Sequence, residues 1–195
     1  MRKSSVWDTG HRAIIGAVNN RRLKTEALLI LENEGAILRT AREVSQLMQA
    51  ARINAAVVGG VAVVLHGHVR TTLDVDVFVP DPAAAATALR GAGFEFEASP
   101  KQFVKQDVPV HLVLLDQIKV APKRLEQIDG VQTVSLCDLI DMKLRSGTSN
   151  VVRSQDLADV IGLIRDRDLK SAYARNLDKA VAADFRRLVK AGRGR

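Results

Sequence analysis

Residues 57–79, VVGGVAVVLHGHVRTTLDVDVFV, decide the fold. They open with a short apolar run that ends at Gly59-Gly60, which is typical of a buried strand entering a tight turn. They close with LDVDVFV, whose alternation predicts a strand with Asp74 and Asp76 on one face. Two carboxylates on one sheet face repel each other unless a cation such as Mg²⁺ or Mn²⁺ neutralises them. The pattern therefore indicates a divalent-metal site, or a strand whose polar face is simply solvated.

The residues between the glycines and the aspartates suggest phosphate recognition. Glycines lack a Cβ atom, so the backbone amides of Gly59 and Gly60 can approach a phosphate closely. Arg70, followed by threonines that include Thr72, leads directly into the aspartate strand. Its guanidinium could clamp a phosphate or hold the aspartates as an ion pair.

Taken together, this stretch resembles the nucleotidyltransferase superfamily, whose signature is an apolar residue, Gly and Gly or Ser, then after a spacer Asp, apolar, Asp or Glu, apolar. Thirteen residues separate Gly60 from Asp74, which fits that signature. His66-Gly67, Arg70 and Thr72 look like the branch related to abortive-infection and toxin–antitoxin nucleotidyltransferases. The resemblance extends weakly over residues 37–165 through LCDLIDMKL and RSQDLADV, which contain Lys143 and Asp156.

The resemblance implies a nucleoside triphosphate bound by its phosphates at Gly59 and Gly60, with Arg70, Thr72 and Lys143 as further phosphate contacts. It implies Mg²⁺ or Mn²⁺ on Asp74 and Asp76. A nucleoside monophosphate would then pass to an acceptor hydroxyl of a protein, an RNA or a small molecule, with loss of pyrophosphate. For Lys143, an ordinary helix-surface lysine is the other interpretation.

One position departs from the family pattern. The superfamily usually adds a third carboxylate on a neighbouring strand, but the corresponding run, VHLVLL, carries His111 instead. An imidazole can ligate a metal or act as a base near neutral pH, and it can equally be a packed structural residue. Two hypotheses follow: a metal-dependent nucleotidyltransferase, of toxin-like or other type, with Asp74, Asp76 and His111 as its catalytic residues, or an impaired member that binds nucleotide, nucleic acid or a partner protein.

The apolar periodicity predicts an α+β protein with a small mixed β-sheet core of nucleotidyltransferase-like type, flanking helices and a helical C-terminal part. We expect an N-terminal extension over residues 1–36 with one helix near 21–33, a core over 37–135, and a helical region over 136–195 packed on that core. The expected helices cover residues 37–51, 82–90, 136–145, 154–165 and 169–190, the third opened by a Ser135-x-x-Asp138 capping box. The expected strands cover residues 55–58, 73–79, 94–97, 103–105 and 108–115, whereas 61–65 is left unclassified and 116–130 is expected to be a loop or a short helix.

Composition and charge limit the remaining classes. The chain has 195 residues, 29 Lys plus Arg against 22 Asp plus Glu, and a single cysteine, Cys137, so an intramolecular disulfide is excluded. The net positive charge lies on residues 1–24 and 170–195, and such ends either bind phosphate, for example of a tRNA acceptor, or are solvated helix faces. No apolar run is long enough for a membrane span, so we expect a soluble, cytoplasmic protein without a membrane partner.

His66 and His68 could pair on a metal, or lie in a loop or at a helix end.

Overall fold

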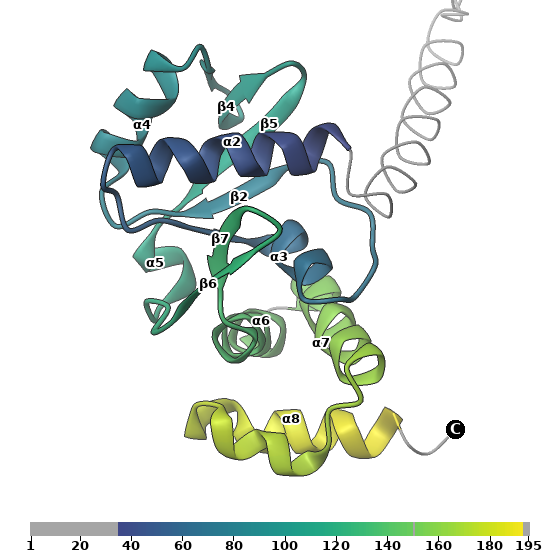
Figure 1. The fold of residues 1–195 in the computed structure, drawn as a ribbon. Helices are drawn as coiled ribbons and strands as arrows, with labels where there is room; N and C mark the ends of the chain where they lie inside the picture. The colour runs from purple at the N-terminus through teal and green to yellow at the C-terminus, as the bar shows by residue number, and fades with distance from the viewer. Residues whose placement is uncertain (1–34, 150, 193–195) are drawn as a thin grey trace, which may run out of the picture.

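A seven-stranded mixed sheet forms the centre of the protein in the computed structural model, which describes residues 35–149 and 151–192. The strand order is β3-β4-β5-β2-β1-β7-β6 (Figure 1). The strands are β1 (Ala56–Val58), β2 (Val75–Phe78), β3 (Glu95–Ala98), β4 (Lys101–Lys105), β5 (Val108–Val113), β6 (Leu125–Ile128) and β7 (Val131–Val134).

Helices surround this sheet and make up most of the C-terminal part. The α-helices are α2 (Ala36–Ala50), α3 (Gly59–Leu65), α4 (Pro82–Gly91), α5 (Leu115–Ile118), α6 (Leu136–Ser149), α7 (Ser154–Asp166) and α8 (Lys179–Gly192). Two short 3₁₀ helices, η1 (Val151–Arg153) and η2 (Ser171–Asn176), precede α7 and α8. The predicted α+β class, with a mixed sheet and a helical C-terminal part, is confirmed.

The two strands from residues 57–79, β1 and β2, lie next to each other at the centre of the sheet. β1 and β2 are antiparallel, with Val58 opposite Asp76. β2 and β5 are parallel, with Asp76 opposite His111. Because neighbouring strands lie about 4.8 Å apart, this register places the aspartate strand directly beside the strand that carries His111.

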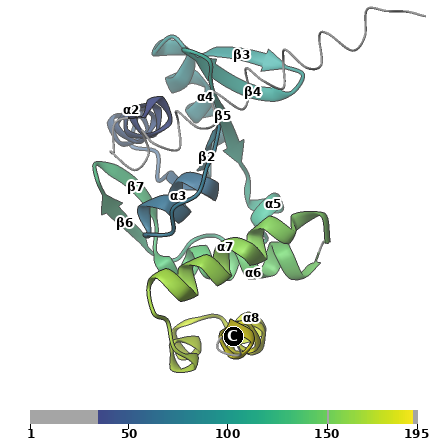
Figure 2. The same ribbon diagram turned by 90° about the vertical axis from the view of Figure 1, so that its right-hand side faces the viewer.

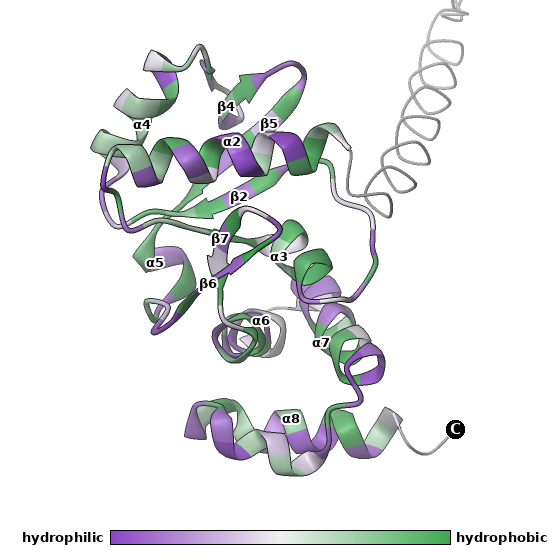
Figure 3. Cartoon of the chain, viewed as in Figure 1, coloured by the Kyte–Doolittle hydropathy of each residue, from purple (hydrophilic) through white to green (hydrophobic). Residues whose placement is uncertain are grey.

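Two apolar cores hold the helices to the sheet. In the first, α2 and α4 pack on alternate residues of the central strands, among them Val75 and Val77. In the second, α6, α7 and α8 pack with β1, α3 and Phe78. Figures 1 and 2 show α8 as the outermost layer, with α6 and α7 between it and the sheet. The mixture of hydrophilic and hydrophobic residues around α2 and α8 in Figure 3 is typical of helices with one buried and one solvated face.

Three expectations about elements are wrong. The stretch over residues 116–130, expected to be a loop or a short helix, contains the end of α5 and also strand β6, which forms a β-hairpin with β7. The expected helix over 169–190 is interrupted at Leu177, because the backbone N–H of Asp178 donates to the carboxylate of Asp141 and α8 starts only at Lys179. Helix α6 continues to Ser149, four residues beyond the expected end at residue 145. The helix expected near 21–33 lies outside the described residues.

The predicted cap at the start of α6 forms in part. The Oγ atom of Ser135 accepts a hydrogen bond from the backbone N–H of Asp138 at 3.2 Å, as expected for a cap. The Asp138 carboxylate accepts instead from the Ser135 hydroxyl at 2.9 Å and from the backbone N–H groups of Lys123 and Arg124. It therefore ties the segment before β6 to the start of α6.

None of the helices in the described ranges has the length and apolar character needed to span a bilayer.

We expect His66 to make the protein less stable in acid. Its Nε2–H donates to the carbonyl oxygen of Val134 at 2.8 Å in a buried position, and burial lowers the pKa of His66 below the ordinary value of 6.5. The unfolded chain therefore binds a proton before the folded one does, so the free energy of unfolding should fall as the pH drops below about 6.5.

Urea unfolding of the wild type and of His66→Gln between pH 5 and 8 measures this effect as a difference between the two proteins. The difference also removes the contribution of His111, whose raised pKa acts in the opposite direction. Parallel pH profiles for the two proteins would contradict the expectation.

Candidate active site

Two aspartates and one histidine meet at the centre of the sheet. Asp74 lies immediately before β2, Asp76 lies on β2, and His111 lies on β5. The Nδ1 atom of His111 is 3.4 Å from Asp74 Oδ2 and 3.4 Å from Asp76 Oδ1. One donor atom from each residue lies within 4.8 Å of the others, and all three side chains are partly exposed. The structure therefore brings together the three residues that the sequence singled out for catalysis.

The two glycines leave the space that this arrangement needs. Gly59 has φ +63°, a left-handed conformation, and a Cβ atom there would overlap the carboxylate of Asp76. A Cβ atom on Gly60 would lie 2.6 Å from Thr72 Oγ1 and 2.7 Å from Arg70 Nη2. The turn between β1 and α3 thus lies directly against Asp76, Thr72 and Arg70.

Thr72 orients the first aspartate. Its hydroxyl donates a hydrogen bond to Asp74 Oδ1 at 2.9 Å, and Thr72 itself is buried. Asp74 Oδ2 remains directed at His111. Since a hydrogen-bonded carboxylate keeps its rotamer, Thr72 fixes the position of one candidate metal ligand.

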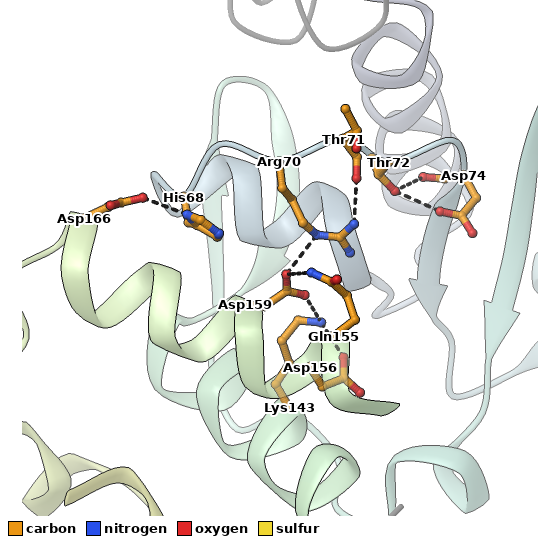
Figure 4. A network of polar contacts seen from close by, with 10 residues as sticks. All are labelled: His68, Arg70, Thr71, Thr72, Asp74, Lys143, Gln155, Asp156, Asp159 and Asp166. Atoms are coloured by element: carbon orange, nitrogen blue, oxygen red, sulfur yellow. Dashed lines mark hydrogen bonds and ion pairs between the residues drawn. The ribbon is translucent and has the colours of Figure 1, made fainter. Parts of the chain in front are cut away.

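A buried cluster of charges lies next to the glycine turn (Figure 4). Asp159, on α7, has a fully buried side chain that is 3.1 Å from Arg70 Nε and 2.8 Å from Lys143 Nζ. Lys143, on α6, also lies 2.7 Å from Asp156. Gln155 donates a further hydrogen bond to Asp159 Oδ1 at 3.0 Å. Arg70 therefore pairs with an aspartate of the C-terminal region and not with Asp74 or Asp76.

A cleft of about 480 Å³ runs from the cluster along α6. Its lining includes Gly59, Asp76, His111 and Lys143 from the sequence-predicted set. Basic side chains line it on several sides, from the described residues Lys101, Lys119, Arg145 and Arg153. A cleft with acidic ligands at one point and cations around it suits a polyanion held together with a divalent metal.

The two aspartates change the pKa of His111. A hydrogen bond with Asp76 raises the pKa of His111 above 6.5, the charges of Asp76 and Asp74 act in the same direction, and burial partly opposes them. Without a metal, the imidazolium form is thus favoured because it sits between two carboxylates. A divalent ion among these three residues would take over the same neutralising role.

The donor set fits such an ion. A metal site on this sheet needs converging donors, and here Asp76 on β2 and Asp74 just before it supply two carboxylates, with His111 as a third donor opposite them. Gly59 has no side chain that would obstruct Asp76. Within the described ranges, these residues form the only group of three or more His, Cys, Asp or Glu side chains that could hold a metal.

The other residues considered from the sequence have separate environments. His66 contacts the Val134 carbonyl, whereas His68 Nδ1 is 2.7 Å from Asp166, so the two histidines do not share a metal position. Cys137 lies 3.1 Å from the Tyr173 hydroxyl, and burial together with this contact raises the pKa of Tyr173. His66, His68 and Cys137 thus each contact another part of the protein and do not belong to the group of Asp74, Asp76 and His111.

Sequence reasoning missed two residues next to the site. Asp159 was not singled out, although it lies three residues after Asp156 on one helix face, a spacing that signals shared surroundings. Gln102 on β4 was also missed, and its Oε1 lies 3.1 Å from His111 Nε2. Nothing local in the sequence indicates that contact, because it depends on the pairing of β4 with β5.

Solved structures of other proteins are similar to this chain over most of its length. An antigenic nucleotidyltransferase-like protein from Paracoccidioides brasiliensis aligns with a TM-score of 0.50 and 18% sequence identity over 78% of this chain and 91% of that chain. The chain therefore has a nucleotidyltransferase-like fold. A candidate nucleotidyltransferase from H. pylori aligns with a TM-score of 0.47 and 15% identity over 78% of this chain and 94% of its own. No protein-family model and no curated protein match the sequence.

We expect loss of the Asp159 charge to destabilise the protein strongly. Asp159→Asn keeps the shape of the side chain but leaves Arg70 without its carboxylate partner and Lys143 with Asp156 alone. Breaking a buried ion pair in this way costs about 3–5 kcal/mol of unfolding free energy. Urea denaturation followed by circular dichroism measures the loss.

Gln155→Ala is the matched control, since it removes a neutral hydrogen bond to the same carboxylate. It should cost only about 1 kcal/mol. Equal effects of the two substitutions would show that the ion pairs contribute little.

Proposed function

We propose that this protein is a divalent-metal-dependent nucleotidyltransferase that transfers a nucleoside monophosphate from a nucleoside triphosphate to an acceptor hydroxyl. One observation carries the proposal: Asp74, Asp76 and His111 converge beside the Gly59-Gly60 turn, at the end of a cation-lined cleft. The nucleotidyltransferase-like fold supports it. Because one fold hosts many functions, the proposal rests on the site and not on the fold alone.

Each part of the site has a proposed role. Asp74 and Asp76 hold the metal with His111 as the third donor, and Thr72 keeps Asp74 in place. When bound, a divalent ion supplies charge stabilisation for the attacking and leaving oxygens of an in-line phosphoryl displacement. The chain's own task is to place the triphosphate so that its reacting phosphorus lies next to these ligands.

The triphosphate would be held by the glycine turn and the cations of the cleft. Gly59 and Gly60 allow close approach of the backbone, and Lys101 and Arg153 line the cleft near His111 and Asp156. Lys143 and Arg70 already pair with aspartates, so we assign each of them two roles: support of the glycine turn and contact with a phosphate. The exposed cations of the cleft then contact the remaining phosphates of the substrate.

We expect Asp74→Asn combined with Asp76→Asn to abolish transfer while the fold persists. The amides keep the side-chain shape and remove the repulsion between two neighbouring carboxylates, but they are poor ligands for a divalent ion. The measurement incubates protein, Mg²⁺ or Mn²⁺ and each α-labelled nucleoside triphosphate, and follows label on protein or added RNA. A loss of at least about 100-fold corresponds to about 2.7 kcal/mol of transition-state stabilisation.

The matched control is Asp116→Asn combined with Asp129→Asn, which makes the same charge change at two exposed positions away from the cluster. This variant should retain the wild-type rate. Full activity of the Asp74/Asp76 variant, or its failure to fold, would mean that the aspartates are structural.

A second candidate function is a nucleotide-binding module without turnover. The specific observation in its favour is His111, an imidazole at the place where the superfamily pattern has a third carboxylate. This candidate expects a fluorescent nucleoside triphosphate to bind in a metal-dependent way without release of pyrophosphate. Pyrophosphate release under the same conditions excludes it.

The exposed cations of helix α8 favour RNA as the acceptor. On α8, Val181, Phe185 and Val189 are buried, whereas four cations of the helix are exposed to solvent: Lys179, Arg186, Arg187 and Lys190. Such a basic face attracts a polyphosphate backbone and releases counterions on binding. We therefore propose tRNA, or another structured RNA, as the acceptor.

Replacement of Arg186, Arg187 and Lys190 by Gln should weaken tRNA binding and flatten its salt dependence. Each lost phosphate contact lowers the slope of log K against log salt by about 0.7 to 0.9, so three contacts lower it by about 2 to 3. Filter binding at several salt concentrations measures the slope. The control replaces three exposed arginines on other elements, Arg52, Arg90 and Arg124, by Gln, and an equal effect of both sets would contradict a specific RNA face.

A further inference from the structure

We propose that Gln102 fixes which nitrogen of His111 faces the two aspartates, and that the site consequently prefers Mn²⁺ to Mg²⁺. Gln102 is thus a positioning residue, because it acts on the metal through His111. The inference deepens the proposed function and rests on it, since it requires that Asp74, Asp76 and His111 hold a divalent ion.

The first step is the alignment of polar residues across adjacent strands. Glu97 on β3 pairs with Gln102 on β4. Phe103 pairs with Val110 in the antiparallel β4–β5 ladder, so Gln102 and His111 lie opposite each other one position further along. His111 pairs in turn with Asp76 on β2. A single row of polar side chains therefore runs from the edge strand to the candidate metal ligands.

The second step assigns the two ends of the Gln102 amide. Its Nε2 lies 2.6 Å from Glu97 Oε2, and an ionised carboxylate can only accept hydrogen bonds. The NH₂ group must therefore face Glu97, which leaves the carbonyl Oε1 directed at His111 Nε2, 3.1 Å away. A carbonyl oxygen also only accepts, so His111 Nε2 carries the hydrogen.

The third step follows from the chemistry of imidazole. Without a metal, Nδ1 also carries a hydrogen, because it faces two carboxylate oxygens that can only accept. When a divalent ion displaces that hydrogen, the hydrogen on Nε2 stays with Gln102 Oε1, and the ion is offered the lone pair of Nδ1. That atom faces Asp74 Oδ2 and Asp76 Oδ1, each at 3.4 Å. Two carboxylate oxygens and one imidazole nitrogen, all electron-pair donors, thus converge. The hydrogen bond on the far side of the ring is the support that metal-binding histidines usually have.

The fourth step concerns which ion this mixed donor set selects. Mg²⁺ takes oxygen ligands and keeps its waters, whereas transition-metal ions also accept an imidazole nitrogen. Mn²⁺ combines both properties, because it suits carboxylates and stands within the transition series. A third carboxylate in place of His111 would give an all-oxygen set and remove the advantage of Mn²⁺.

The experiment compares Mn²⁺ binding, followed by electron paramagnetic resonance, in the absence and presence of Mg²⁺. The wild type should retain Mn²⁺ against a large excess of Mg²⁺. Gln102→Met keeps the length of the side chain but cannot hold the Nε2 hydrogen, so Mn²⁺ affinity should fall about 10-fold or more, the usual effect of losing such a support. The affinity for Mg²⁺ alone should change less.

Two further variants test the route through His111. His111→Asp should raise the affinity for Mg²⁺ relative to Mn²⁺, and in that background Gln102→Met should have no further effect on the preference. The matched control is Gln127→Met, because Gln127 is an exposed strand glutamine on β6 at the opposite edge of the sheet. The control should bind both ions as the wild type does.

A direct readout of the ring completes the test. Nitrogen-15 NMR of the Mg²⁺-loaded protein should show His111 as a single tautomer with hydrogen on Nε2 in the wild type and as a mixture of tautomers in Gln102→Met. If the wild type binds neither ion, the metal site fails, and the proposed function fails with it. If it binds Mn²⁺ but Gln102→Met changes neither the preference nor the tautomer, only the inference about Gln102 is overturned.

Discussion

The rest of the structure depends on the charge of Asp159, which is fully buried. A buried carboxylate is tolerated only when cations and hydrogen-bond donors surround it, and here Arg70 and Lys143 supply the cations. Arg70 comes from the segment before β2, Lys143 from α6 and Asp159 from α7. One electrostatic requirement thus joins the loop that leads to the aspartates with the C-terminal helices. The glycine turn lies against the same arginine, so the candidate phosphate side of the site depends on this requirement as well.

Local patterns predicted much of the fold because they are set by near neighbours in the chain. The alternation around Asp74 and Asp76 and the helical period of α2 both express burial on one face, which is readable from sequence alone. The β6–β7 hairpin also had a local signal, Asp129-Gly130, a turn pair that was not used. The break before α8 had none, because the Asp141 carboxylate that holds the Asp178 amide comes from 37 residues away.

The candidate site shows the same limit. The sequence named Asp74, Asp76 and His111, and strand pairing brings them together. It did not reveal the partners of Arg70 and Lys143, because ion pairs across three segments require the tertiary arrangement. Gln102 is the clearest case, since an isolated glutamine in a short strand has no distinctive pattern. Only the register of β4 against β5 gives it a role next to His111.

Among the residues that the structure describes, strand β3 lies at one edge of the sheet, and all four of its residues are exposed. Open edges invite pairing with a second molecule, and charged side chains such as Glu95 and Glu97 discourage it. Glu97 therefore places a charge on the edge strand and at the same time orients the amide that contacts His111. Protection of the sheet edge and the geometry of the candidate metal site thus share one side chain, so selection on either property constrains the other.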